Sequence, residues 1–382
     1  MPITLSYTEP PERLRDETGS FEHIGPGADR LAQVTQLTEK LKSVEPPIPN
    51  KDGDIELLGA VPAVHRFVDA PGDSETVRWH FVECGPSDAD TVIFLHGVPD
   101  SWWQWHHVME ELAESRHCIA VDLKGYGQSD KRTGDYRQAG VATQLIALFD
   151  ELGVDQFSLV AHDRGTPPAD HIVARLGERI TGYGRGQQHL WHLNPVLHPQ
   201  ESMFTSPDAH NLLANAPAFV ATAYSVLTER SVAFDDLRRT VEEFSHPGIA
   251  SAVPRYFHSS SFRQEWVDRR TELIQRWRSP VLLLQGAHDA LQPREFYDDP
   301  EVLKRLPSGS GVHFFDAGHF WPFEAVKETV EVITEFVLRD PPCPNKLHCK
   351  RISRRKGTHD ESGRAQSVWR AVLRRLRRTI AT

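Results

Sequence analysis

The stretch 157–165 combines an apolar strand, a sharp turn and a carboxylate at the tip of that turn. The strand Phe-Ser-Leu-Val runs through the small Ala161 into His-Asp-Arg-Gly165, and a helix is predicted from there to about residue 176. Small residues on both sides let the turn tighten and push its central side chain, Asp163, into a pocket. A carboxylate is already charged at pH 7, so Asp163 can displace a leaving group from a saturated carbon. The product is an ester of the enzyme, which water must then cleave.

Two later loops carry the groups that this second step needs. Asp289 lies in Gly-Ala-His-Asp after one predicted strand, and His319 lies in Asp-Ala-Gly-His after the next. In this scheme His319 accepts a proton from the water that attacks the ester, while Asp289 accepts the other imidazole N–H and fixes the tautomer. The order along the chain is therefore nucleophile, acid, histidine, which predicts a catalytic triad.

An upstream turn, His96-Gly-Val-Pro99, directly follows another buried strand. When water attacks the ester, the carbonyl oxygen becomes an oxyanion, so hydrogen-bond donors must already be in place. The backbone N–H groups of Val98 and Arg164 are the expected pair, because Pro99 has no N–H to donate.

The elements around these loops alternate between strands and helices. Strands are predicted at 64–68, 76–84, 91–95, 117–122, 157–161, 180–183, 280–286 and 311–315, with helices at 27–44, 103–115, 139–152 and 322–338. Such alternation predicts a mostly parallel sheet with helices on both faces. We therefore predict an α/β core formed by residues 61–185 and 279–340. Between these two parts, residues 186–278 read as helices and loops, which predicts an inserted helical cap over the sheet edge where ligands bind.

The two ends of the chain differ from this core. Residues 1–60 are rich in Pro, Gly and charge, and we interpret them as an N-terminal arm with one helix. The net charge is −10, but the segment 346–382 carries twelve Lys and Arg against two Asp and Glu. We interpret residues 341–382 as a basic, poorly ordered tail with no nucleic-acid partner.

Composition bears on the class of protein and on its cellular compartment. The chain has 382 residues, an ordinary balance of apolar and charged residues and no run of 18 apolar residues. Its first residues contain no basic stretch followed by an apolar one, so we expect that the protein is not secreted. Its four cysteines are irregularly spaced, which favours free thiols in a reducing compartment: Cys84, Cys118, Cys343 and Cys349. We therefore expect a cytoplasmic protein without a membrane span or a metal site, with a homodimer left open.

These motifs together resemble a known family. The segment His96-Gly-Val-Pro-Asp-Ser-Trp-Trp-Gln-Trp, the turn Gly125-Tyr-Gly-Gln-Ser-Asp, the Asp163 turn, Asp289 and His319 are similar to the epoxide hydrolase and haloacetate (fluoroacetate) dehalogenase branch of the α/β-hydrolases. The resemblance covers roughly residues 60–340. It implies the α/β-hydrolase fold with a helical cap, no cofactor, and hydrolysis of a small molecule through an alkyl ester on Asp163.

The two enzymes of this branch treat the leaving group differently. Epoxide opening, the activity that we predict first, requires a proton on the departing oxygen, which the family takes from two cap tyrosines. Tyr256 matches the second of these tyrosines, while Tyr224 and His210 compete for the place of the first. Dehalogenation is the alternative, and it releases an anion. Arg164 resembles an arginine that the dehalogenases of this branch set against a substrate carboxylate.

Two further residues are expected to line the substrate pocket, His96 and Trp102. A hypothesis of another class is a catalytically silent protein that binds a small ligand. The complete triad argues against it, because a binding module has no need of Asp163, Asp289 and His319 together.

Overall fold

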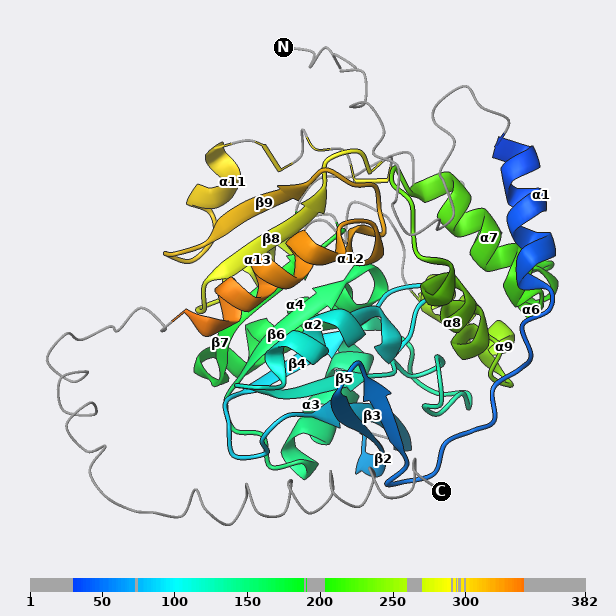
Figure 1. Ribbon diagram of the computed structural model, residues 1–382. Helices are drawn as coiled ribbons and strands as arrows, with labels where there is room; N and C mark the ends of the chain where they lie inside the picture. Colours follow the sequence, from blue (N-terminus) through cyan, green and yellow to red (C-terminus); the bar gives the residue numbers. More distant parts are fainter. Residues whose placement is uncertain are drawn as a thin grey trace, which may run out of the picture. The chain divides into compact units, whose positions relative to one another are not determined.

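The computed structural model describes residues 30–72, 75–188, 190, 203–259, 270–289, 291–292, 294, 297–298 and 300–339 (Figure 1). The predicted basic tail and most of the predicted N-terminal arm lie outside these residues, as do Cys343 and Cys349. Cys84 and Cys118 are buried free thiols.

One sheet of nine strands runs through the described part of the chain, in the order β1-β2-β3-β5-β4-β6-β7-β8-β9. The three pairs at the β1 end are antiparallel, and the five pairs from β5 to β9 are parallel. The mostly parallel sheet predicted from the sequence is confirmed. The strands are β1 (Ile55–Leu58), β2 (Val61–Pro71), β3 (Thr76–Cys84), β4 (Thr91–Leu95), β5 (His117–Val121), β6 (Phe157–His162), β7 (Ile180–Gly186), β8 (Val281–Gly286) and β9 (Gly311–Phe315).

Helices cover both faces of this sheet (Figure 1). On one face α3 (Gln138–Glu151) and α4 (Thr166–Leu176) pack together, and on the other α2 (His106–Leu112) packs against α13 (Val326–Leu338). Each pair belongs to a separate apolar cluster, one on each side of the sheet. The central strands β4 and β6 are therefore buried on both faces, which explains their nearly continuous apolar sequences. Shorter helices complete these layers: η1 (Trp102–Trp105), η2 (Asp163–Gly165), η3 (Gly177–Arg179), α11 (Pro300–Lys304) and α12 (Trp321–Glu324).

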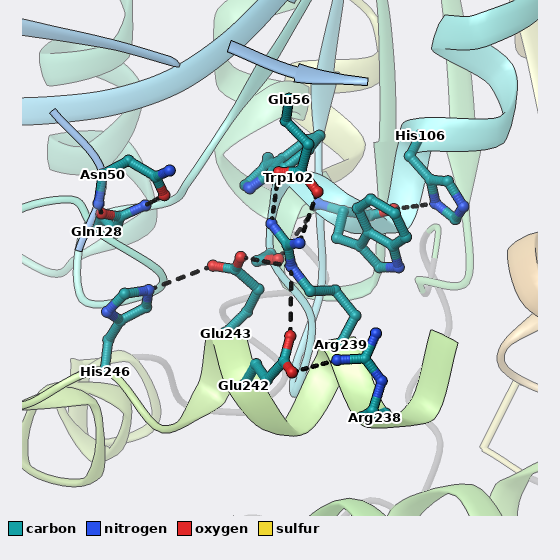
Figure 2. Close-up of polar contacts among 12 residues, drawn as sticks. Asn50, Glu56, Trp102, His106, Gln128, Arg238, Arg239, Glu242, Glu243 and His246 are labelled. Atoms are coloured by element: carbon teal, nitrogen blue, oxygen red, sulfur yellow. Dashed lines mark hydrogen bonds and ion pairs between the residues drawn. The ribbon is translucent and has the colours of Figure 1, made fainter. Parts of the chain in front are cut away.

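The segment between β7 and β8 is helical wherever it is described in regular structure. Its helices are α6 (Ala209–Ala214), α7 (Ala216–Leu227), α8 (Phe234–Phe244) and α9 (Ile249–Ser259), which gather at one side of the sheet (Figure 1). Arg239 of α8 reaches across to Glu56 of β1 with two hydrogen bonds of 2.6 and 2.8 Å (Figure 2). This bidentate pair fixes α8 against the antiparallel end of the sheet.

The region before residue 61 contains more structure than the prediction of an arm with one helix. Its helix, α1 (Arg30–Leu41), packs on α7 through Leu37 and Leu41, which are fully buried. The strand β1 is absent from the prediction, and it pairs with β2. Its sequence, Ile-Glu-Leu-Leu, is too short and too irregular to show strand periodicity. No helix in the described part of the chain combines the length and the apolarity needed to cross a bilayer.

Candidate active site

Asp163 lies at the tip of the turn that joins β6 to α4, where its backbone has a φ of 44°. Residues other than glycine rarely adopt this left-handed backbone conformation, so the surrounding structure must hold the turn in place. Two glycines make the necessary room. A Cβ on Gly97 would lie 2.5 Å from that of Asp163, and a Cβ on Gly165 would lie 2.7 Å from two backbone carbonyl oxygens. The carboxylate is thereby held between β4 and β6 at their carboxyl ends.

The structure brings Asp163, His319 and Asp289 together. His319 lies in the loop after β9 and Asp289 in the loop after β8. The Nδ1 atom of His319 donates to Oδ2 of Asp289 at 2.9 Å, and its Nε2 atom is 3.6 Å from Oδ2 of Asp163. All three residues are less than one-tenth exposed. The imidazole therefore stands between two carboxylates.

This arrangement shifts the pKa values of the two facing groups in opposite directions. Burial alone would lower the pKa of His319, but the charge of Asp289 and the hydrogen bonding and charge of Asp163 outweigh it and raise that pKa to about 10. Burial would raise the pKa of Asp163, but His319 and the Val98 N–H hold it well below its usual value. The resting site therefore holds an ionised nucleophile beside an imidazolium.

Two residues that the sequence analysis did not select position this triad. Gln187, directly after β7, has a φ of 48°. Its side chain donates to Oδ2 of Asp289 and accepts from the N–H of Gly286 at 2.9 Å. His162 accepts from Gln104 at Nδ1 (3.0 Å), so its Nε2–H donates to the backbone carbonyl of His319, also at 3.0 Å. Gln187 directly follows a parallel strand that lies beside the nucleophile strand, and this position could have indicated a role at the site.

The predicted oxyanion donors lie on either side of the nucleophile. The N–H of Val98 donates to Oδ1 of Asp163 at 3.0 Å, so this donor is already directed at the carboxylate. Arg164 follows Asp163 in the turn and is buried, and its guanidinium lies 4.6 Å from the centre of the Phe257 ring.

A cavity of about 260 Å³ opens above Asp163. Most of its wall is apolar and comes from the helical segment between β7 and β8 and from the loops after β8 and β9. Among the described residues, six polar ones line it: Asp163, Arg164, Gln188, Thr222, Gln292 and His319. Gln188 and Gln292 were not selected from the sequence. The amide Nε2 of Gln188 is a donor 3.4 Å from Oδ2 of Asp163, and Gln292 accepts from the Tyr297 hydroxyl at 3.0 Å.

His96 and Trp102 were expected to line the substrate pocket, but neither residue lines this cavity. His96 is fully buried: its Nδ1–H donates to the Gly97 carbonyl at 2.7 Å, and its Nε2 accepts from the Leu123 N–H at 3.0 Å. It holds the turn before Val98 in shape. The indole of Trp102 is also fully buried, in the apolar cluster on the α2 face.

The expected roles of Tyr256, Tyr224 and His210 also differ from their placement. None of them lines the cavity. The hydroxyl of Tyr256 donates to the backbone carbonyl of Lys124 at 2.8 Å, and that of Tyr224 donates to Asp100 at 2.7 Å. His210 lies on an exposed surface of α6, where its Nδ1 contacts the Ser251 hydroxyl at 3.1 Å. The sequence places these residues in the right segment but does not determine the direction of their side chains.

Comparison with known proteins identifies the fold. The family described as alpha/beta hydrolase fold matches residues 90–183, which include the turn at Val98 and the nucleophile turn. The chain has the α/β-hydrolase fold. A solved epoxide hydrolase from Vigna radiata superposes on 74% of this chain and 99% of its own, with a TM-score of 0.61 and 23% identity. At that identity the likeness concerns the fold.

Three curated relatives are similar in sequence to parts of this chain. Epoxide hydrolase 2 of Caenorhabditis elegans is 32% identical over 103 residues, 26% of this chain and 28% of the relative. A haloalkane dehalogenase of Mesorhizobium japonicum is 43% identical over 102 residues, 27% and 33% of the two chains. The match thus spans about a third or less of these two relatives. Epoxide hydrolase 3 of Xenopus tropicalis is 25% identical over 286 residues, 69% and 76% of the two chains. Over these segments the chain is similar to epoxide hydrolases and to a haloalkane dehalogenase.

Proposed function

We propose that this chain hydrolyses a small organic molecule at a saturated carbon, through an ester formed on Asp163. The observation that carries the proposal is the pairing of a strained, ionised carboxylate with a buried His319–Asp289 pair at the floor of an apolar cavity. A carboxylate at this position can attack an alkyl carbon, whereas a serine hydroxyl would attack a carbonyl.

The first step uses the two oxygens of Asp163 differently. Oδ1 accepts the Val98 N–H and remains as the carbonyl oxygen of the ester. Oδ2 supplies the electron pair for the new bond to carbon, and the electrons of the broken bond leave with the departing group. The low pKa of Asp163 keeps this oxygen ionised across the neutral range.

The second step depends on the loss of that charge. At 3.6 Å, and with an effective dielectric constant of about 20, a unit charge on Asp163 stabilises the His319 imidazolium by about 4–5 kcal/mol. Esterification neutralises the carboxylate, so the pKa of His319 falls and the imidazole becomes able to accept a proton. It then takes a proton from water, whose oxygen attacks the ester carbonyl carbon while the Val98 N–H stabilises the oxyanion. On collapse the bond to the alkoxy oxygen breaks and that oxygen takes the proton from His319, which releases the alcohol. The carboxyl group, now with one oxygen from water, gives its proton back to His319 and restores the Asp163 carboxylate.

The cavity favours a small and mainly apolar substrate. Its volume of about 260 Å³ lies near the lower end of ligand pockets, which are typically about 300–1,000 Å³. Aliphatic and aromatic side chains form most of the wall, including Phe204, Phe219 and Phe257.

The leaving group decides between the two substrate classes. Epoxide opening is supported by the relatives named above, and it needs an acid beside the departing oxygen. The chain has seven tyrosines, of which the six at 126–297 are described, and none of these six lines the cavity. Arg164 and Gln188 do line it, and both carry N–H donors suited to a departing anion. We therefore favour a carbon–halogen substrate and retain epoxide opening as the second candidate.

The experiment is parallel turnover of chloroacetate, 1-bromobutane and 1,2-epoxyhexane, measured as halide release and diol formation. Halide release that depends on Arg164 and Gln188 supports the first candidate. Diol formation that survives Tyr224→Phe and Tyr256→Phe supports epoxide opening with another acid. If none of the substrates turns over or alkylates Asp163, the proposed function fails for these classes.

A further inference from the structure

A second cluster of histidine and aspartate side chains lies where α8 meets the beginning of α2. It consists of His106 and His107 from α2 and Asp236 from α8. The Nε2 atom of His106 is 3.5 Å from Oδ1 of Asp236, and that of His107 is 3.5 Å from Oδ2. None of the three residues lines the cavity above Asp163, so the proposed hydrolysis does not use them.

The hydrogen bonding of His106 determines which of its ring nitrogens carries a proton. Its Nδ1 atom is 2.7 Å from the backbone carbonyl oxygen of Trp103, which can only accept, so Nδ1 must donate. In the neutral ring Nε2 then carries a lone pair, and that lone pair faces the carboxylate of Asp236. Two acceptors in this position repel each other unless a cation lies between them. Donation from Nδ1 to a backbone carbonyl is also the usual arrangement of a histidine that binds metal through Nε2.

The spacing suits tetrahedral coordination. Zinc–nitrogen distances are about 2.0–2.1 Å and zinc–carboxylate distances about 2.0–2.2 Å, which separate two ligand atoms of a tetrahedron by about 3.4 Å. Both nitrogen–oxygen distances here are 3.5 Å, and one ligand atom from each residue lies within 4.8 Å of the others. The two imidazoles and one carboxylate therefore need only small side-chain adjustments to bind one ion.

The surroundings hold these ligands in place and leave a route for an ion. The indole Nε1–H of Trp103 donates to Oδ1 of Asp236 at 3.2 Å, and its ring stacks on that of His106 with centres 3.7 Å apart. Asp236 and His106 are almost fully buried, whereas the side chain of His107 is 31% exposed. Solvent can therefore reach the cluster from the His107 side, where water can complete the coordination.

The nearby guanidinium of Arg239 does not cancel the charge of this cluster. It lies 4.8 Å from the centre of the Trp103 ring and is bound to Glu56 and Glu243, with Glu242 at 4.0 Å (Figure 2). Arg238 lies on the same side and is bound to Glu242, so three carboxylates face two guanidinium groups there. With both imidazoles neutral, the cluster keeps the negative charge of Asp236 for a divalent ion.

We propose that His106, His107 and Asp236 form a binding site for a divalent transition metal of the zinc class. Two nitrogen ligands and one carboxylate suit Zn²⁺ better than Mg²⁺ or Ca²⁺, which prefer oxygen. The ion would tie α8 to the first turn of α2, two segments more than 120 positions apart in the sequence. Its role is to fix the helical wall of the cavity against the sheet, which goes beyond the proposed hydrolysis and does not depend on it.

The test is a Zn²⁺ titration of the full chain after chelator treatment, by calorimetry and by thermal unfolding, with Co²⁺ as an absorption probe. The variants are Asp236→Asn, His107→Gln and Trp103→Phe. The matched control is His313→Gln, which removes a histidine that contacts one carboxylate, Glu328, at 2.9 Å. Co²⁺ also separates this site from one built on Cys343 and Cys349, because thiolate ligands give a charge-transfer band that imidazole and carboxylate do not.

We expect one equivalent of Zn²⁺ to bind and raise the unfolding temperature, and Co²⁺ to bind without a thiolate band. Asp236→Asn and His107→Gln should weaken this binding at least 100-fold, and Trp103→Phe about 10-fold, as for other residues that orient metal ligands. The control should bind as the parent does. Equal affinity in the parent and in His107→Gln, whose side chain is the most exposed of the three and the least needed for folding, would overturn the proposal. Absence of Zn²⁺ binding by the folded parent would do the same.

Discussion

Two of the buried aspartate and histidine clusters in the described part of the chain differ in the ratio of the two residues. In the candidate active site one imidazole, His319, stands between the carboxylates of Asp163 and Asp289. At the junction of α8 and α2 one carboxylate, Asp236, faces two imidazoles. Each cluster joins chain segments that lie far apart in the sequence. Hydrogen bonds from a neighbouring residue hold each one in place: Gln187 binds Asp289, and Trp103 binds His106 and Asp236.

The ratio determines which cation the cluster stabilises. Two carboxylates around one imidazole favour a proton on that imidazole, which is why the pKa of His319 rises to about 10 despite burial. At the second cluster, the Trp103 carbonyl fixes the proton of His106 on the far side of its ring. The lone pair that remains is suited to a metal ion. Removing one charged member should therefore have different consequences in the two clusters.

The largest effect is expected at the nucleophile. Asp163→Ala removes the atom that forms the ester, so turnover should fall by about 10⁴-fold or more, by analogy with nucleophile removal in other hydrolases. The measurement is kcat/KM with whichever substrate the parent turns over. Asp316→Asn, which alters a half-exposed carboxylate 2.8 Å from His288, is the control and should keep parental turnover. Substantial activity in Asp163→Ala would contradict the assignment.

Asp289→Asn tests the second carboxylate of the same cluster. An asparagine cannot provide the charge that stabilises the imidazolium, so ester hydrolysis should slow by about 10⁴-fold, as for the buried aspartate of another triad. Ester formation should change much less, because Asp163 remains ionised. Rapid-quench kinetics separates the two steps, and an equal loss in both would show that Asp289 acts on more than His319.

The raised pKa of His319 also predicts how stability depends on pH. The folded pKa of about 10 exceeds the unfolded value of about 6.5, so the contribution is complete below about pH 6.5 and is lost as pH rises toward 10. Its size is on the order of a few kcal/mol. Chemical denaturation of the parent and His319→Gln across this range should show a difference in unfolding free energy that shrinks with rising pH. A difference that stays constant would contradict the charge pairing.

The smallest of these effects is expected at a residue that positions the triad. Gln187→Leu removes the amide that donates to Asp289 and leaves the N–H of Gly286 without its acceptor. We expect destabilisation of about 1–3 kcal/mol and a loss of about 10-fold in ester hydrolysis. The acid limb of the pH–rate profile should also move, which a purely structural role would not cause. An unchanged profile in a folded variant would show that Gln187 acts only in folding.

The sequence predicted the parts of the site that depend on local pattern. The nucleophile turn and the loops carrying Asp289 and His319 each follow a strand in a parallel sheet, so their meeting at one edge follows from topology. The direction of the Tyr256 and Tyr224 hydroxyls depends on distant partners, Lys124 and Asp100, which no local pattern reveals. The left-handed backbone of Gln187 was equally hidden, because such a conformation is usual for glycine rather than for glutamine.

The cluster of His106, His107 and Asp236 could not be predicted from the sequence either. His106 and His107 begin a short helix, and Asp236 lies about 130 positions later in another segment. No spacing motif connects them, and a sequence with twenty histidines offers many such pairs. Arg239 of α8 binds Glu56 of the sheet (Figure 2). The three residues meet through this docking of α8 on the sheet.

The ester on Asp163 is the central claim, and trapping it is the most direct test. His319→Gln should still form the ester but fail to hydrolyse it, so incubation with a substrate that the parent turns over should add the mass of the alkyl group to the peptide carrying Asp163. In the parent, turnover in water enriched in ¹⁸O should place the heavy oxygen in that carboxylate. An unmodified Asp163 in the variant, with no ¹⁸O incorporated by a parent that still turns over, would contradict the mechanism.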